Sequence, residues 1–310
     1  MSGRAGKLMA LAGVDLDNKT TKGLQNVFSR ILNNGMHGLC FSPYEESQEP
    51  GSQITEAQIR RRIKIIRPYT KWIRSFSCTD GNENIPRIAK EYGIKTLVGA
   101  WLGDNQDINK KEIDGLIKLA QEGLVDIAAV GNEVMYRGDL TEEALLNFMY
   151  QVKEALPNTP VGYVDAYYEF AQRPKITEAC DVILANCYPY WEGCHIAYSL
   201  IYMKDMFHQA MKAANGKKVI ITETGWPSLG EGLHGALPSF ENAIKYFINT
   251  QRWSKTDDID IFYFSSFDES WKAGVEGDVG AYWGLWDKDE NLKFADRYIM
   301  KNRNRLFNLK

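Results

Sequence analysis

The chain has 310 residues, of which 44% are hydrophobic and 25% are charged, a composition typical of globular proteins. Its net charge of -3 provides no basic surplus for a phosphate backbone, so we expect no nucleic-acid partner. No run approaches about 18 consecutive apolar residues, which predicts that no membrane span is present.

Short apolar runs alternate with longer segments of helical period from residue 36 onward, a pattern typical of βα units with a parallel sheet. Residues 1–35 are predicted to form a lead-in with one helix over 22–32. The predicted strands are 38–42, 72–77, 96–101, 126–134, 161–166, 182–188, 218–224 and 259–267. The predicted helices between them are 55–67, 83–92, 110–121, 141–156, 170–179, 196–214 and 239–253.

Eight βα units over about 270 residues have the size of a (β/α)8 TIM barrel, so we predict the α/β class and one catalytic domain over 36–310. An open, doubly wound sheet is the structural alternative. Its dinucleotide-binding version is disfavoured because no G-x-G-x-x-G motif follows the first predicted strand.

The five cysteines do not suggest a disulfide framework, because their number is odd and they are sparse in a chain of this length. Cys187, Cys194 and His195 are close in the sequence, but no CxxC pair accompanies them. We therefore expect no metal site and no cofactor.

Two glutamates end predicted strands and are the candidate catalytic groups. Glu133 follows Asn132 at the end of the fourth strand, and Glu223 precedes a Gly-Trp-Pro stretch at the end of the seventh. In a barrel the carboxyl ends of all strands meet at one mouth, so both side chains should project into it. Two carboxyl groups in one cleft, with pKa values pushed apart, are what glycoside cleavage requires. The alternative is that each glutamate is a structural ion-pair partner.

Segments 130–134 (Val-Gly-Asn-Glu-Val) and 222–228 (Thr-Glu-Thr-Gly-Trp-Pro-Ser) resemble the two signatures of glycoside hydrolase family 17. The likeness runs from Gly38 to about Phe294, and segment 188–193 (Tyr-Pro-Tyr-Trp-Glu-Gly) is more similar to the bacterial branch than to the plant branch. The resemblance implies a (β/α)8 barrel and a retaining, laminarinase-like hydrolase that acts on β-1,3-glucan.

Carried over residue by residue, the resemblance implies that Glu133 is the general acid/base and Glu223 the nucleophile. Asn132 would bind the 2-hydroxyl of the sugar, a contact that strengthens in the transition state. Tyr188 would hold the nucleophile's carboxylate, with packing under the barrel rim as its alternative. Asp165, at the end of the fifth strand, is a candidate sugar ligand.

Segment 267–272 resembles the family's motif on the eighth strand, in which Glu269 and Lys272 match. Lys272 would tune the pKa of the acid/base, or the two residues would brace the rim as a salt bridge. Arg74 and Asp80 could form a supporting pair at the rim.

Five tryptophans lie in or just after the ends of predicted strands, where indole rings can stack on glucose while their N–H groups stay hydrated. We predict sugar contacts for Trp191, Trp226 and Trp271, and expect at least two of the five to be packing residues instead. The tryptophans are Trp191, Trp226, Trp271, Trp283 and Trp286.

Three other functions remain open. A β-1,3-glucanosyltransferase would use the same two glutamates, a Schiff-base enzyme would use Lys218 or Lys272, and a catalytically inactive protein would only bind β-glucan. We expect a monomer. A polysaccharide substrate predicts a secreted, periplasmic or cell-surface location, although the first residues lack the pattern of a signal peptide.

Overall fold

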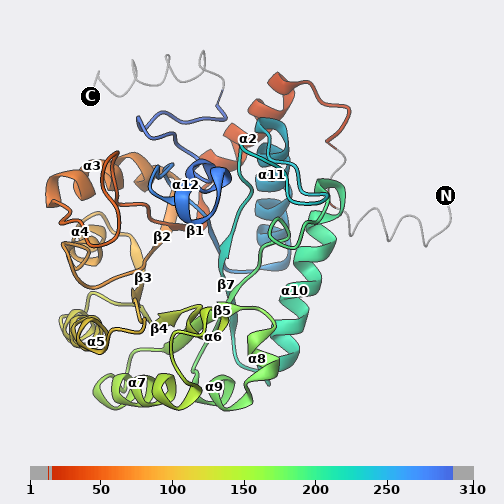
Figure 1. The fold of residues 1–310 in the computed structure, drawn as a ribbon. Coiled ribbons are helices and arrows are strands. Elements are labelled where there is room, and N and C mark those ends of the chain that lie inside the picture. Colours follow the sequence, from red (N-terminus) through yellow and green to blue (C-terminus); the bar gives the residue numbers. More distant parts are fainter. Residues whose placement is uncertain (1–12, 14–15, 296–310) are drawn as a thin grey trace.

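The computed structural model describes Gly13 and residues 16–295, and its centre is a closed barrel of eight parallel strands (Figure 1). Each strand pairs with the next in the chain, and β8 pairs with β1, so the (β/α)8 prediction is confirmed. The strands are β1 Met36–Cys40, β2 Thr70–Ser75, β3 Lys95–Ala100, β4 Ile127–Asn132, β5 Val161–Ala166, β6 Ile183–Asn186, β7 Val219–Thr224 and β8 Ile261–Tyr263.

Helices between the strands form the outer ring of the barrel (Figure 1). They are α3 Glu56–Ile66, α4 Asn84–Glu91, α5 Gln106–Gln121, α7 Glu142–Ala155, α8 Glu169–Gln172, α9 Pro174–Ala179, α10 Ser199–Ala213 and α11 Phe240–Asp257. The short helices α6 Val134–Arg137 and α12 Lys272–Val275 follow β4 and β8, and the 3-10 turns are η1 Arg67–Tyr69, η2 Ile196–Tyr198 and η3 Asp278–Tyr282.

Five of the described α-helices, α2, α3, α5, α7 and α11, begin after a residue whose side chain caps them. Thr55 and Gln58 form a reciprocal capping box at the start of α3, and Thr141 caps α7. The single helix predicted over 170–179 is wrong, because the structure has α8 and α9 there. Pro174 separates them, since proline has no N–H to donate and its ring clashes with a preceding turn.

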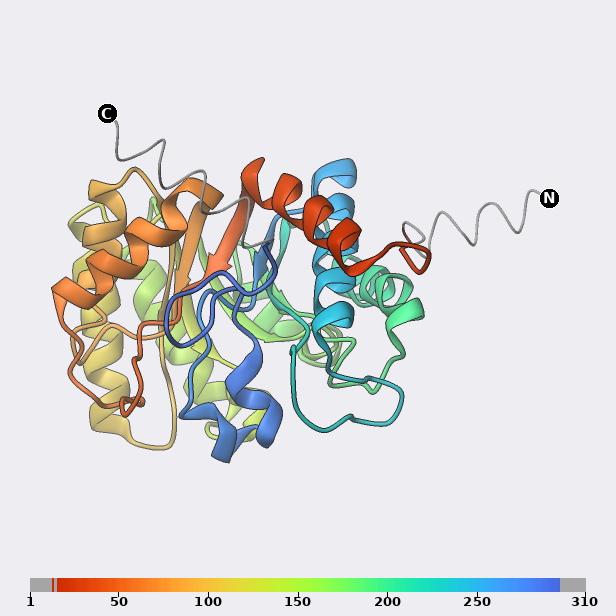
Figure 2. The same ribbon diagram turned by 90° about the horizontal axis from the view of Figure 1, so that it is seen from above.

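Helix α2, Thr21–Asn33, comes before the first strand and packs against α11 and η1. It lies beside α11 in both ribbon views (Figures 1 and 2). Its buried residues, Leu24, Val27, Phe28 and Leu32, form one apolar stripe that faces the core. The helix therefore completes the outer ring between the last and the first βα units. The remainder of the predicted lead-in, 1–12 and 14–15, lies outside the described residues.

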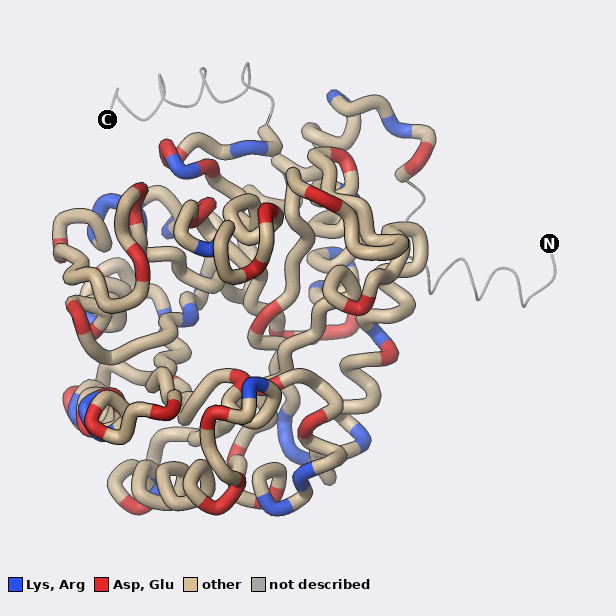
Figure 3. Tube along the Cα trace, in the orientation of Figure 1, with Lys and Arg blue, Asp and Glu red and all other residues tan. Residues whose placement is uncertain are grey.

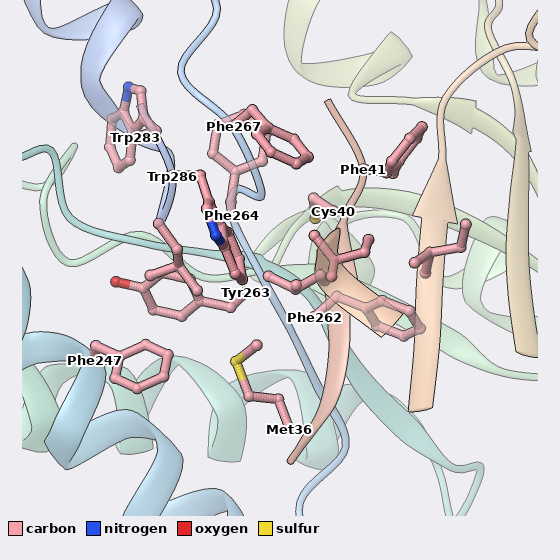
Figure 4. Packing of buried hydrophobic residues seen from close by; sticks show 14 of the residues in the cluster. Met36, Cys40, Phe41, Phe247, Phe262, Tyr263, Phe264, Phe267, Trp283 and Trp286 are labelled. Atoms are coloured by element: carbon pink, nitrogen blue, oxygen red, sulfur yellow. The ribbon is translucent and has the colours of Figure 1, made fainter. Parts of the chain in front are cut away.

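Large aromatic side chains fill the core beside β8, as Figure 4 shows. Tyr263 packs edge-on against Phe247 of α11, with ring centroids 5.1 Å apart. Phe267 and Trp286 have centroids 5.8 Å apart, which anchors the segment after β8 to the barrel. Such packing makes the wall beneath the mouth rigid.

The loops at the carboxyl ends of the strands project from one end of the barrel. Figure 2 shows segments 41–55 and 225–239 and helix α12 extending from this same end. Lysine and arginine are interspersed with aspartate and glutamate over the outer helices (Figure 3). No helix within the described part of the chain is long and apolar enough to cross a membrane.

Candidate active site

Glu133 follows directly after β4, where the backbone bends away from the strand. Gly131 has φ 81° and Glu133 has φ 51°, and the pairing of β4 with β5 shifts register between Ala129 and Asn132. A Cβ on residue 131 would lie 2.9 Å from Val134 Cγ2, so the bend requires glycine. A non-glycine residue at positive φ is uncommon, and such residues cluster at functional sites.

The surroundings of Glu133 favour its protonated form. Burial raises the pKa of this carboxyl to about 7, and the negative charge of Glu223 adds to the shift. The side-chain amide of Asn186 donates to Glu133 Oε1 at 2.8 Å, which partly offsets the rise in pKa. Asn186 Oδ1 in turn accepts from the Thr222 hydroxyl at 2.9 Å, so the orientation of the amide is fixed. A general acid needs a pKa in this range.

Glu223 lies on β7 and is held by two donors. Arg74 Nη1 donates to Glu223 Oε1 at 2.5 Å, and the Tyr188 hydroxyl donates to Glu223 Oε2 at 2.8 Å. The contact predicted for Tyr188 is therefore present. Because both oxygens accept hydrogen bonds and one partner is a cation, the arrangement holds the carboxyl group in a fixed orientation.

Arg74 lies under the site, so its predicted pairing with Asp80 at the rim is wrong. The buried guanidinium joins three strands, because its Nη2 donates to Asn132 Oδ1 at 2.6 Å while Nη1 binds Glu223. Asp80 is exposed in the loop after β2. Because Arg74 already donates to its oxygen, Asn132 has chiefly its amide N–H groups to offer to a ligand.

Both glutamates line one cleft of about 520 Å³ at the mouth of the barrel. The other lining residues come mainly from the segments after β4, β5, β6 and β8. Ring-bearing side chains predominate, which suits a ligand with apolar faces and polar edges. They are Tyr136, Tyr167, Tyr168, Tyr188, Trp191 and Phe264.

Two more carboxyl groups, those of Glu192 and Glu276, line the same cleft. The sequence predicted no role for Glu276. Burial raises its pKa to about 7, Lys272 lowers the value, and the charges of Glu223 and Glu269 raise it further. Glu276 follows α12 in a segment without a recognisable motif, so its position in the sequence carries no signal. Asn186 was missed as well, although a polar side chain at the end of a buried strand could have indicated it.

The three predicted tryptophans differ in position. Trp191 is 41% exposed and lines the cleft. Trp271 is partly buried and meets Tyr44 edge-on at 6.0 Å. Trp226 is buried, and its Nε1 donates to Leu237 O at 3.0 Å. Its predicted contact with sugar is therefore replaced by packing.

Asp165 lies beneath the cleft, and its side chain has no surface for a sugar. The residue is 0% exposed, and its carboxylate accepts from the Tyr163 hydroxyl and from the backbone N–H groups of Ala166 and Tyr136. The sugar contact predicted for Asp165 is thus not what the structure provides. This carboxylate instead fixes the backbone on either side of the cleft floor.

Glu269 and Lys272 form a buried ion pair of 2.9 Å, as the rim-bracing interpretation expects. Lys272 Nζ also lies 4.1 Å from the centroid of the Phe264 ring, and Glu269 Oε1 accepts from Tyr44 N at 3.4 Å. Burial lowers the pKa of Lys272, but the charges of Glu269, Glu276 and Glu223 raise it above its ordinary value. Lys272 therefore remains a cation beside the carboxylates of the cleft.

A larger hollow of about 790 Å³ lies on the outer wall beside α9 and the end of α10. Its lining has one carboxylate, Glu178, together with Lys212 and Lys217. It therefore lacks the pair of acids that the mouth provides. No cluster of three or more His, Cys, Asp or Glu side chains that could hold a metal ion occurs in the part of the chain that the structure describes.

The fold is a (β/α)8 barrel, and two glutamates lie in one cleft lined by aromatic rings. One glutamate is protonated near neutral pH and the other is ion-paired. This combination defines the class of glycoside hydrolases that have a barrel fold. The chain belongs to the family described as the BtgE/BtgC glycoside hydrolase domain, whose model matches residues 38–284. The resemblance to glycoside hydrolase family 17 is confirmed.

Similar proteins come from fungi and a bacterium. A glucan 1,3-beta-glucosidase of Candida albicans is 27% identical over 263 residues, which cover 75% of this chain and 84% of the relative. The solved β-1,3-glucanosyltransferase of Rhizomucor miehei is 29% identical with a TM-score of 0.76, and the match covers 85% of this chain and 98% of that one. An endo-laminarinase from Formosa, 18% identical with a TM-score of 0.70 over 84% of this chain and 86% of that chain, shares the fold.

Proposed function

We propose that this chain is a retaining glycoside hydrolase that cleaves β-1,3-glucosidic bonds in laminarin-type β-glucan. The observation that carries the proposal is the contrast between two carboxyl groups in one cleft. Glu133 is half-buried and has a raised pKa, whereas Glu223 accepts hydrogen bonds from Arg74 and Tyr188. Glu133 is accordingly assigned as acid/base and Glu223 as nucleophile.

The reaction follows from these two states. A carboxylate oxygen of Glu223 attacks the anomeric carbon, the bond from that carbon to the leaving oxygen breaks, and Glu133 gives its proton to that oxygen. Glu133 then removes a proton from water while the water oxygen attacks the same carbon and releases Glu223. The amide N–H groups of Asn132 are available for the 2-hydroxyl, because Arg74 occupies the amide oxygen. The names of the relatives support β-1,3-glucan as the substrate.

Azide rescue tests the assignment of roles. Glu223→Ala should lose turnover and regain it with azide, yielding an α-linked glycosyl azide. Glu133→Ala should be rescued to a β-linked product when the leaving group is activated, because the glycosyl-enzyme still forms. A β-linked product from Glu223→Ala together with an α-linked product from Glu133→Ala would reverse the assignment.

Comparison of two glucans tests the substrate. A β-1,3-linked chain curls, so we expect it to follow a cleft whose rings are set at changing angles. Wild-type protein should release sugar from laminarin and negligible amounts from cellulose. Comparable rates on laminarin and on a soluble β-1,4-glucan would contradict the specificity and leave the two-glutamate mechanism intact.

Glucanosyl transfer is the second candidate activity. The cleft continues from Glu133 toward β5 and β6, where Tyr167, Tyr168 and Trp191 could hold an acceptor sugar in place of water. The solved glucanosyltransferase with 29% identity is consistent with this use. A time course at high laminari-oligosaccharide concentration separates the two activities, because transfer yields products longer than the substrate and hydrolysis does not.

The organisation of the protein is part of the proposal. The packing of α2 on α11 supports one catalytic unit over the described residues, and we expect it to be a monomer. A polysaccharide substrate supports a secreted, periplasmic or cell-surface location. Light scattering of the purified chain would test the oligomeric state.

A further inference from the structure

The segment after β3 carries an exposed tryptophan on a tightly held backbone. Trp101 is 40% exposed, whereas the next residue, Leu102, is buried. Gly103, the residue after Leu102, is held by the fully buried side chain of Asn109 on α5. Asn109 Oδ1 accepts from Gly103 N at 2.8 Å, and Asn109 Nδ2 donates to Gly103 O at 2.7 Å. Such a reciprocal pair of hydrogen bonds fixes the path of the chain just after the exposed ring.

A second buried side chain of α5, Glu112, holds the tryptophan itself. Glu112 Oε2 accepts from Trp101 N at 3.1 Å, so the backbone that bears the ring is tied to the helix. The same carboxylate accepts from three groups of the segment after β2, namely Ser77 Oγ, Cys78 N and Thr79 Oγ1. Burying a carboxylate is costly unless its oxygens are satisfied, and here most of its partners belong to two surface loops.

Arg137 connects the ring to the catalytic end of β4. Its guanidinium carbon lies 4.7 Å from the centroid of the Trp101 ring and covers one face. Its Nη2 donates to Leu102 O at 3.2 Å, and its Nη1 donates to Asn132 O at 2.6 Å. The indole is therefore fixed relative to Asn132 and Glu133, and Trp101 stays 40% exposed although Arg137 covers one face of its ring.

We propose that Trp101 is a stacking platform for a glucosyl unit of the substrate, on the side of Glu133 opposite to the β5–β6 part of the cleft. The strand order places β3 on one side of β4, and β5 on the other. Tyr167, Tyr168 and Trp191 line the cleft on the β5–β6 side. Trp101 is not part of the cleft lining but follows β3, so we expect a glucan to reach it only when the chain is long enough to extend past Glu133 in the other direction.

The rigidity of the segment is the main reason for this assignment. Ordering a mobile tryptophan on binding would cost affinity, whereas a ring that is already fixed loses little freedom. An indole presents an apolar face and a polar N–H, which matches the apolar face and hydroxyl edge of a glucose ring. This inference rests on the proposed function and adds a substrate contact that the sequence analysis did not foresee.

Chain-length dependence tests the platform. Trp101→Ala is compared with wild type on laminari-oligosaccharides of increasing length, beginning with the shortest that the wild type cleaves. We expect kcat/KM to fall roughly tenfold to 100-fold on long chains, the range for burial of one apolar side chain, and less than about twofold on the shortest. Trp101→Tyr should recover part of the loss and Trp101→Leu should not.

Tyr150→Ala is the matched control. Tyr150 is 56% exposed on α7, in the outer ring of the barrel, so its removal should leave kcat/KM unchanged at every length. An equal loss on short and long chains would mean that Trp101 acts on the catalytic centre through Arg137, and would overturn the platform, as would no loss at any length. A wild-type protein that cleaves no laminari-oligosaccharide would refute the proposed function first, and the platform with it.

Discussion

Glu133 and Glu223 are the same amino acid in one cleft, and their neighbours set their chemistry. The pKa of about 7 at Glu133 arises mainly from burial. Glu223 is buried as well, but it has a guanidinium and a phenol on its two oxygens. The single residue whose loss would disturb this contrast most is Arg74, because it contacts both Glu223 and Asn132.

The pH dependence of activity should report the Glu133 proton. We expect kcat/KM on laminari-oligosaccharides to decrease as the pH rises through about 7, because the unprotonated carboxylate cannot assist the leaving oxygen. Glu276 also has a pKa of about 7, so Glu276→Gln is the control and should retain this decrease. An aryl glucoside with a good leaving group should show a weaker decrease. Identical profiles for both substrates would contradict the role of Glu133 as acid.

The same pKa predicts how Glu133 affects stability. The folded-state pKa of about 7 exceeds the ordinary value of 4.5, so the folded chain holds this proton more tightly than the unfolded chain does. Stability from this residue is fully present below pH 4.5 and is lost as the pH rises through 7. Urea unfolding of Glu133→Gln and wild type should therefore show the variant gaining relative stability between these values. If the difference in unfolding free energy between the variant and wild type stayed constant across this pH range, the raised pKa of Glu133 would be contradicted.

Removing the Arg74 guanidinium should strongly lower the free energy of unfolding. Arg74→Met leaves Glu223 buried without its counter-charge, and breaking a buried pair costs about 3–5 kcal/mol. Arg87→Met is the matched control, because its ion pair with Glu122 is solvent-exposed and should be worth less than about 1 kcal/mol. Thermal or urea unfolding measures both values. Similar losses of stability in the two variants would show that the buried pair of Arg74 and Glu223 contributes no more than an exposed one.

At the scale of elements, the bend at the end of β4 directs the acid/base. Gly131→Ala should lower stability by roughly 1–3 kcal/mol because of its positive φ, and should also lower kcat, since the new Cβ meets Val134 and displaces Glu133. Gly138→Ala has a similar φ of 73° with nothing within 4 Å of the added Cβ. Gly138→Ala should therefore lose stability and keep its kcat. Loss of kcat in both Gly131→Ala and Gly138→Ala would indicate a general effect of backbone strain.

The elements also show what a single sequence can predict. Segment 161–166 was predicted as a strand and is β5, because a run of buried apolar residues between turns has few other interpretations. The ends of the strands were sufficient to find Glu133 and Glu223. Arg74 was assigned to the wrong partner, Asp80, and Asn186 was not assigned, because contacts across the barrel depend on register and on which strand residues point inward. Glu276 depends on the path of an irregular segment, for which the sequence has no periodic signal.

At the scale of the whole molecule, we expect the described residues to unfold as one cooperative unit. β8 pairs with β1, and α2 packs on α11, so early and late elements of the described residues stabilise each other. Tryptophan fluorescence and far-UV circular dichroism should therefore give the same midpoint in urea. Separate midpoints would indicate that part of the barrel unfolds independently.

The pairing of β1 with β8 has a consequence for biosynthesis. Gly38 is aligned with Phe262, so one edge of β1 has no strand partner until the ribosome has made almost the entire barrel. At about 5–20 residues per second, that wait lasts roughly ten to forty seconds. An unpaired strand edge is a template for pairing with other chains. A nascent chain that stops before β8 is therefore the species most prone to aggregate, and its need for chaperones should end when β8 leaves the exit tunnel.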